Sequence, residues 1–245
     1  MPWGNGVSTR KKLADGTFPD LRVAGSVVLV PEAPMTVESA GPADGRARLL
    51  SVQTDPDGSG IVRADLSGCY TGTEELADVA GRPKCVVRDL GIRAVRSIAV
   101  DHSGKTGVPV LVVVADQLTG TKTNNVWQLC TAPEHDVAVA DNTFTIRAKN
   151  GATLRGTVVT PAPPVIKVEP ARFVHEINYH ARHRHAEFTR QVIRVSGGET
   201  FLVVLTVQTG EAPAVKRDGG KITVGGKALT FDGEQILTEE IGRTK

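Results

Sequence analysis

The chain has 245 residues, of which 40% are hydrophobic and only 4% aromatic, and its formal net charge is +2. This length fits one large all-β domain or two small ones. The charge is too small to indicate nucleic acid or a membrane surface as a partner. No apolar run approaches the roughly 18 residues that a bilayer-spanning segment needs.

Alternating or continuously apolar runs predict many short strands rather than helices. Valine dominates these runs, which favours strands because β-branched side chains fit a pleated surface. The predicted strands are 22–30, 35–39, 47–54, 61–66, 84–89, 92–101, 108–117, 125–130, 143–148, 153–159, 165–168, 188–195, 201–208, 221–224 and 228–232. The one helical candidate is residues 74–80, which could form one or two turns before Gly81 and Pro83 end them.

Turn residues separate the predicted strands. Asn150-Gly151 and Gly225-Gly226 each stand between two strand-like runs and predict two-residue hairpins. The proline-rich segment 161–164 predicts an extended crossing or a sheet edge, because proline cannot donate to a strand ladder. The sequence therefore predicts an all-β fold with little or no helix: a flexible segment over residues 1–20, then one large, mostly antiparallel β-sandwich domain over residues 21–245.

The first residues carry no basic segment followed by an apolar one, so we expect no secretory signal there. The chain is then either cytoplasmic or begins after a removed segment. Three cysteines, at positions 69, 85 and 130, are too few and too unevenly spaced for a disulfide framework. We expect small buried thiols, with a bridge between Cys69 and Cys85 as the alternative.

A series of short motifs runs through residues 45–235. In order they are Ala64-Asp65-Leu66 with Tyr70, the arginine-bearing run 92–100, the valine-rich run 108–116, Trp127-Gln128-Leu129, Phe144-Thr145-Ile146, Gly151-Ala152-Thr153-Leu154, Asn178-Tyr179 and the closing pair of runs 221–232. This order resembles the C-terminal β-sandwich domain of the heparinase II/III-like polysaccharide lyases. The resemblance implies a β-sandwich, β-elimination on a uronate-containing polysaccharide if the chain is catalytic, and a periplasmic or secreted bacterial context.

The sequence departs from that family's pattern in two ways. Such lyases also have a helical toroid, which supplies a tyrosine and an asparagine or histidine to the active site, and their sandwich opens with a His-Gly-His-x-Asp-like strand. This sequence predicts neither, so the family's catalytic and zinc residues have no firm counterparts here, and enzymatic activity stays open. A sandwich without its first strands would expose an edge strand, which implies a homo-oligomer or a separate helical-domain subunit as partner.

The densest group of chemically active residues is 175–185, which holds four of the six histidines. β-Elimination needs a cation or strong donor to neutralise the uronate carboxylate, a base with a pKa near the working pH, and a donor for the leaving oxygen. The candidate catalytic residues are Tyr179, His180, Arg182 and His183. The candidate substrate-binding residues are Trp127, Asn178, Arg184 and His185, although Trp127 also fits the core.

The same segment fits three other interpretations. It could be a solvated basic loop without catalytic duty, or it could contact a glycan without chemistry. It could also bind a divalent metal such as zinc, because His183 and His185 alternate onto one face of an extended segment and His180 could join them from a turn. The sequence thus leaves three functions open: a lyase-related protein for acidic polysaccharide, a non-catalytic glycan-binding or subunit-supporting module, and a metal-binding β-sandwich.

Overall fold

The computed structural model describes residues 26–33, 47–77, 83–122, 124–179, 182–233 and 235–238, and for residues 72–77, 83–87, 172–179 and 182–188 it describes the backbone path. Within these residues nearly every element is a strand, and one 3-10 turn, Ser67–Cys69, is the exception. None of the helical structure described there is long and apolar enough to cross a membrane. The all-β class predicted from the sequence is confirmed.

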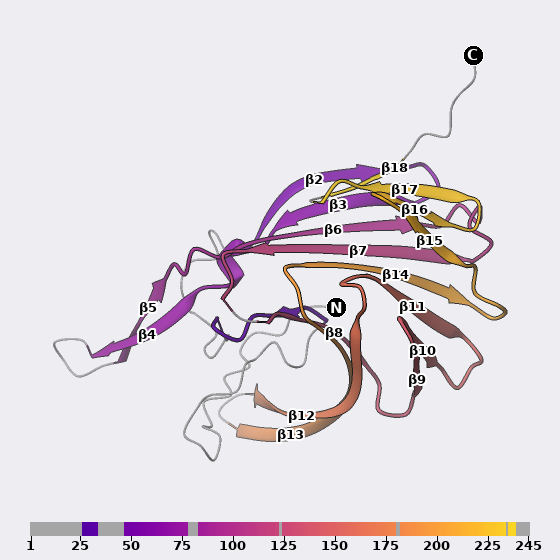
Figure 1. Ribbon diagram of the computed structural model, residues 1–245. Coiled ribbons are helices and arrows are strands. Elements are labelled where there is room, and N and C mark those ends of the chain that lie inside the picture. The colour runs from indigo at the N-terminus through magenta and orange to yellow at the C-terminus, as the bar shows by residue number, and fades with distance from the viewer. Residues whose placement is uncertain are drawn as a thin grey trace.

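A central sheet of eight antiparallel strands forms the middle of the molecule, in the order β2-β3-β6-β7-β14-β11-β10-β9 (Figure 1). Its strands are β2 (Arg48–Thr54), β3 (Gly60–Asp65), β6 (Arg93–Asp101), β7 (Val110–Thr119), β9 (Asp136–Ala140), β10 (Thr143–Arg147), β11 (Thr153–Thr160) and β14 (Thr200–Gln208).

Two four-stranded sheets lie against the central sheet. The first, called here the hairpin sheet, has the order β1-β8-β13-β12, and the second, called the C-terminal sheet, has the order β15-β16-β17-β18. Their strands are β1 (Val28–Leu29), β8 (Val126–Thr131), β12 (Val165–Tyr179), β13 (Arg182–Ser196), β15 (Val215–Asp218), β16 (Lys221–Val224), β17 (Lys227–Phe231) and β18 (Ile236–Thr238). A separate hairpin of β4 (Gly72–Ala77) and β5 (Pro83–Arg88) projects from the body (Figure 1).

The middle strands of the central sheet, β7 and β14, are buried on both faces, so the sandwich has three layers there. In β14, Phe201 and Val203 pack with the hairpin sheet, while Leu202 and Val204 pack with the C-terminal sheet. Strand side chains alternate between faces, so a strand buried on both sides needs a continuous apolar run instead of an alternating one. This explains the run 201–205, and β7 follows the same rule.

Two glycine turns close hairpins of different lengths. Val224 pairs with Lys227, which confirms the two-residue loop at Gly225-Gly226. Gly225 has a φ of +55°, and a Cβ there would lie 2.2 Å from the Thr106 carbonyl oxygen, so only glycine fits. The Asn150-Gly151 turn does join β10 to β11. Its loop has three residues, however, because the Ala148 N–H donates to the Ala152 carbonyl oxygen at 2.9 Å.

Several predicted elements differ from the observed ones. The possible helical turns over residues 74–80 are not observed in residues 74–77, where β4 pairs with β5 and this pairing overrides the local helix preference of Glu-Glu-Leu-Ala. Residues 78–80 lie outside the described residues. Strands β12 and β13 are much longer than predicted, and β9, β15 and β18 were not predicted. Of the predicted strand 22–30, residues Val28–Leu29 pair with β8. The predicted flexible segment 1–20 and strand 35–39 lie outside the described residues.

Candidate functional site

The candidate site is built on the hairpin of β12 and β13, two strands of 15 residues each that pair from Val165–Ser196 to Tyr179–Arg182 without a register shift. The prolines of segment 161–164 carry the chain from β11 of the central sheet into β12. The hairpin begins within the hairpin sheet, and its outer part curves away from the central sheet (Figure 1). The segment 175–185 is therefore strand on both sides of residues 180–181 and not a surface loop.

The register divides the hairpin into two faces of different charge. One face carries the odd-numbered positions of β12 and the even-numbered positions of β13, and we call it the basic face. It holds five lysine or arginine positions and one acidic position, Glu169. The basic positions are Lys167, Arg182, Arg184, Arg190 and Arg194. The opposite face holds one arginine position and two glutamate positions, so the positive charge gathers on one side.

The register separates the candidate catalytic residues. Tyr179 and Arg182 are directly opposed and share the basic face, together with Arg184. His183 is opposed to Asn178 on the other face, as His185 is to Glu176. The candidate His180 lies outside the described residues.

The extended conformation of β13 agrees with one requirement of the metal-binding hypothesis. His183 and His185 are two positions apart in β13, so their backbone positions share a face, as the hypothesis requires. Among the residues with described side chains, no group of three or more His, Cys, Asp or Glu is arranged to hold a metal ion. The hypothesis therefore stays a prediction about the hairpin positions.

Trp127, the remaining candidate for substrate contact, is a core residue. Its side chain is 3% exposed in β8, where it pairs with Val195 and Val28. Its ring lies 6.4 Å, centre to centre, from that of Phe144 in β10. This burial leaves no ring face on which a sugar could stack, so the substrate-binding assignment is corrected: Trp127 joins the hairpin sheet to the central sheet.

The base of the hairpin is fixed by polar contacts. Arg194 forms an ion pair with Glu169 across the two strands. Gln191 Nε2 donates to the carbonyl oxygens of His135 at 2.7 Å and Pro133 at 3.1 Å. Lys167 and Arg190, in contrast, are exposed on the basic face. The described part of the basic face therefore combines a fixed ion pair with two exposed cations.

Cys130 lies in β8, where it pairs with Val192 of β13, and burial raises the pKa of its thiol against the opposing influence of Arg190. A raised pKa lowers the thiolate fraction, so this cysteine is not an activated nucleophile. Cys69 is partly buried against the main core, and because the side chain of Cys85 is not among those described, the Cys69–Cys85 bridge stays a prediction.

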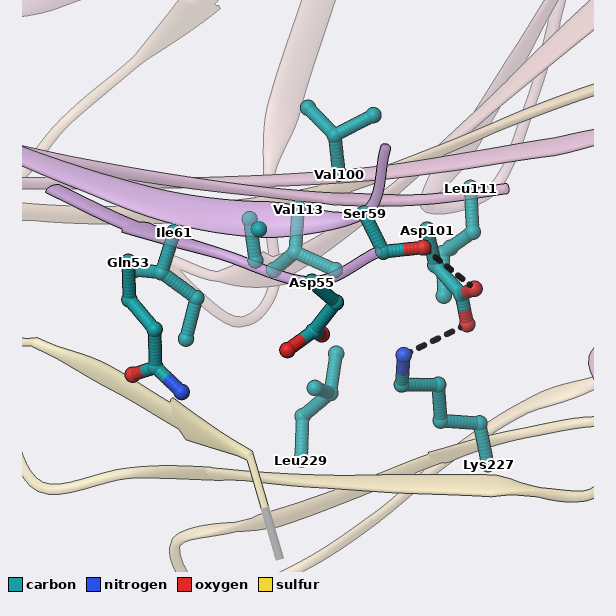
Figure 2. A pocket seen from close by; sticks show the side chains of 12 residues that line it. Gln53, Asp55, Ser59, Ile61, Val100, Asp101, Leu111, Val113, Lys227 and Leu229 are labelled. Carbon is teal, nitrogen blue, oxygen red and sulfur yellow. Dashed lines mark hydrogen bonds and ion pairs between the residues drawn. The ribbon is translucent and has the colours of Figure 1, made fainter. Parts of the chain in front are cut away.

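A second polar cluster, which no sequence motif indicated, lies between the central and C-terminal sheets. Lys227 Nζ of β17 lies 2.7 Å from Asp101 Oδ2 of β6, and both side chains are largely buried (Figure 2). The Ser103 N–H donates to Asp101 Oδ1 at 2.7 Å, and the Ser59 hydroxyl lies 3.4 Å from the same oxygen. Burial alone would raise the pKa of Asp101, but the hydrogen bonds from Lys227 and Ser103 lower it to about 2.

The cavity beside this ion pair is small. It has a volume of about 10 Å³ and is lined by Gln53, Asp55, Leu111 and Leu229 along with the ion pair itself (Figure 2). Such a volume holds about one water molecule. The cluster therefore joins two layers and has no room for a sugar.

An open groove of about 570 Å³ lies between the β9–β10 turn, the proline-rich segment and β15. Its one arginine, Arg217, donates to Thr160 Oγ1 at 2.8 Å and to the carbonyl oxygens of Gly219 at 2.8 Å and Val159 at 3.4 Å. These contacts turn the guanidinium toward the protein, so the groove offers a ligand mainly apolar walls.

Comparisons with known proteins give evidence at the level of structure only. No family model matches the chain, and no curated protein matches it. A solved heparinase III with methylated lysines aligns with a TM-score of 0.51 and 14% identity, over 84% of this chain and 29% of its own. Heparan sulfate lyase HepC from Pedobacter heparinus aligns with a TM-score of 0.50 and 10% identity, over 92% of this chain and 33% of its own.

The likeness is one of fold. This chain has a polysaccharide-lyase-like β-sandwich, as the order of sequence motifs predicted, and it spans about a third or less of the length of those two enzymes. At such identities the alignment transfers no catalytic residue. Function has to be argued from the hairpin.

Proposed function

We propose that this chain is a polysaccharide-lyase-type sandwich module that binds acidic, uronate-containing polysaccharide through the basic face of the β12–β13 hairpin. The observation that carries the proposal is the hairpin register, which gathers five lysine or arginine positions on one face with a single acidic position among them. The fold supports it, because the two enzymes that share the fold have names that refer to heparin and heparan sulfate, which are acidic polysaccharides.

The spacing of the basic positions suits an extended polyanion. A strand advances about 3.3 Å per residue, so Arg182 and Arg184 stand about 7 Å apart, and Arg190 stands about 20 Å further along β13. Guanidinium groups bind carboxylate and sulfate with two parallel hydrogen bonds. A row of such groups along a strand fits a linear polymer with repeated anionic groups better than it fits a compact ligand.

The same register favours binding over catalysis at the hairpin. A general base and a leaving-group donor must both come within hydrogen-bond reach of one sugar. Tyr179 and Arg182 share the basic face, but His183 belongs to the opposite face. The register therefore does not place these three residues on one face as a catalytic group. It does place Arg182, Arg184 and Arg190 on one face.

The test is an affinity measurement on the whole chain with immobilised heparan sulfate. The double variant R182Q/R184Q removes two charges from the basic face, and R88Q/R93Q removes two exposed charges elsewhere. We expect the first to weaken binding at least about tenfold, since hydrogen bonds between charged groups contribute roughly 1.5–3 kcal/mol each. The second is expected to change affinity less than about twofold, because long-range surface charge is screened by salt.

Two comparison ligands and one activity assay define the proposal. Uncharged dextran should not bind, and single-stranded RNA should bind more weakly than heparan sulfate. Ultraviolet absorbance of unsaturated uronate should not grow during incubation; if it does, and if Tyr179→Phe stops it, the chain is a lyase and not a binding module. Equal losses of affinity in the two double variants would contradict the assignment of the basic face.

A further inference from the structure

The two edges of the central sheet differ in how much apolar surface they expose. At one edge lies β2, in which every residue is exposed. Leu49 is 62% exposed, Leu50 37% and Val52 52%, and Val62 of the neighbouring β3 is 40% exposed. The opposite edge strand, β9, contributes one such residue, Val139, at 41%. Among the described residues, four of the seven large exposed apolar side chains thus lie on β2 and the neighbouring β3.

An edge strand of this composition is open to pairing with another strand. Between Leu49 and Thr54 there is neither a charged residue nor a proline, the two residue types that most often keep sheet edges apart. Its register with β3 shifts once, between Leu49 and Ser51, and is regular from Ser51 to Thr54. Strand β2 is the last strand of the sheet in the part of the chain that the structure describes.

The apolar residues of this edge share one side of the sheet. Val52 pairs with Val62, which pairs with Ile98, and Ile98 packs against the core beneath the hairpin sheet. Leu49 pairs with Ala64 on the same side. A strand added beside β2 would therefore meet a row of apolar side chains on that side.

The charges at the two ends of β2 indicate which strand could pair with it. Arg48 begins the strand and Asp55 follows it, and the residues between them are uncharged. Arg48 is 3.6 Å from Asp65 in an exposed ion pair, a contact of low energy. In an antiparallel pair of two β2 strands, the Arg48 end of one strand lies beside the Asp55 end of the other. The strand is thus complementary to itself in both charge and apolarity.

We propose that two copies of this chain associate through antiparallel pairing of their β2 strands. The pairing extends the central sheet from one copy into the other around a twofold axis, and such closed, isologous contacts are the usual form of homodimers. Val52 of each copy meets its counterpart near the axis, and Leu49 of each copy packs toward the end of the partner's strand. The interface uses no residue of the β12–β13 hairpin, so it is independent of glycan binding.

The first test measures the molar mass of the whole chain by analytical ultracentrifugation over about 1–100 µM, the range in which a dimer of ordinary affinity dissociates. We expect a dimer whose dissociation constant rises at least about tenfold in Val52→Lys, because a lysine on an edge strand opposes pairing. Val139→Lys on β9 is the matched control and should leave the constant within about twofold. Both positions are exposed, and circular dichroism confirms folding. Leu49→Lys serves as a second variant.

The second test examines the antiparallel orientation by exchanging charges. Arg48→Asp alone and Asp55→Arg alone should each weaken the dimer, because each places like charges together at both ends. An equal mixture of the two variants should form a heterodimer of nearly native affinity, since opposite charges then meet at both ends. Arg147→Asp, which breaks another exposed ion pair, is the control and should have no effect.

Two results would overturn the proposal. One is a monomer at every concentration. The other is a dimer that Val52→Lys and Leu49→Lys leave intact while both variants remain folded. A dimer weakened by Val52→Lys whose charge variants are not rescued by mixing would overturn the antiparallel orientation.

Discussion

In the body of the sandwich and in the β12–β13 hairpin alike, side chains alternate between the two faces of a strand, but the two regions place different side chains on those faces. In the central sheet both sides of the strand are apolar, and a few buried ion pairs cross between strands or layers, such as Arg96–Asp116 and Asp101–Lys227. In the hairpin one side is rich in arginine. If the proposed function holds, the difference assigns stability to the body and recognition to the hairpin. Substitutions in the body should therefore leave the affinity for polysaccharide unchanged, and substitutions in the hairpin should leave the free energy of unfolding unchanged.

The largest expected effect in the body is at Trp127. Trp127→Ala removes a fully packed indole between two layers and should lower the free energy of unfolding by about 3–5 kcal/mol. Because the ring is 3% exposed, affinity for heparan sulfate should be unchanged wherever the variant is folded. Denaturant titration measures the first quantity and binding at low temperature the second. A loss of affinity in a fully folded variant would make Trp127 a ligand contact.

The next effect concerns the buried ion pair between β6 and β17. Lys227→Met leaves the Asp101 carboxylate buried without its cation and should cost about 3 kcal/mol of unfolding free energy. The double variant D101N/K227M removes both charges and should recover part of that loss. Denaturant titration of these two variants, of Asp101→Asn and of wild type forms a mutant cycle. Additive losses would show that the two side chains do not interact.

The pH dependence of stability follows from the same pair. The pKa of Asp101 is lowered from 3.8 to about 2 in the folded protein. A lowered carboxyl pKa stabilises the fold above the unfolded value, and this contribution is lost as pH falls through the folded value, a change of about 2 kcal/mol here. Wild type should therefore exceed Asp101→Asn in stability at pH 5, and the difference should shrink toward pH 2. A constant difference in stability across this pH range would contradict the lowered pKa of Asp101.

Much of the fold was predictable because the strands that form it are locally encoded. The runs around β6, β7, β11 and β14 are long and rich in valine, and the predicted ranges agree with the observed ones to within a few residues. The pairing of Ile61 with Ala99 and of Ala99 with Val113, by contrast, joins distant segments, and only the tertiary structure fixes it. In the third layer, β16 and β17 were predicted, whereas β15 was missed because a short polar strand has no alternation of its own.

The site was only partly predictable for two physical reasons. Residues 172–188 are polar and charged, so no apolar period marked them as strand, and the extension of β12 and β13 comes from their pairing with each other. The face shared by Arg182, Arg184 and Arg190 is a property of that register. Asp101 and Lys227 are far apart in the sequence, and no local signal joins them.

The smallest effect expected is at Lys167, an exposed cation near the base of the basic face. Lys167→Gln should weaken heparan sulfate binding by about two- to fivefold, as the loss of one exposed charge contact does. Its free energy of unfolding should stay within about 0.5 kcal/mol of wild type. Affinity and denaturant titrations on one preparation check both values. Lys216→Gln, an exposed lysine of the C-terminal sheet, is the control and should change neither.

The most direct test of the central claim is hydrogen exchange on the whole chain with and without a heparan sulfate oligosaccharide. If the hairpin is the recognition surface, amides of residues 165–196 gain protection on binding while those of β4 and β5 and of the C-terminal sheet do not change. Protection confined to any other region, with binding itself established, would contradict the division between a stabilising body and a recognising hairpin.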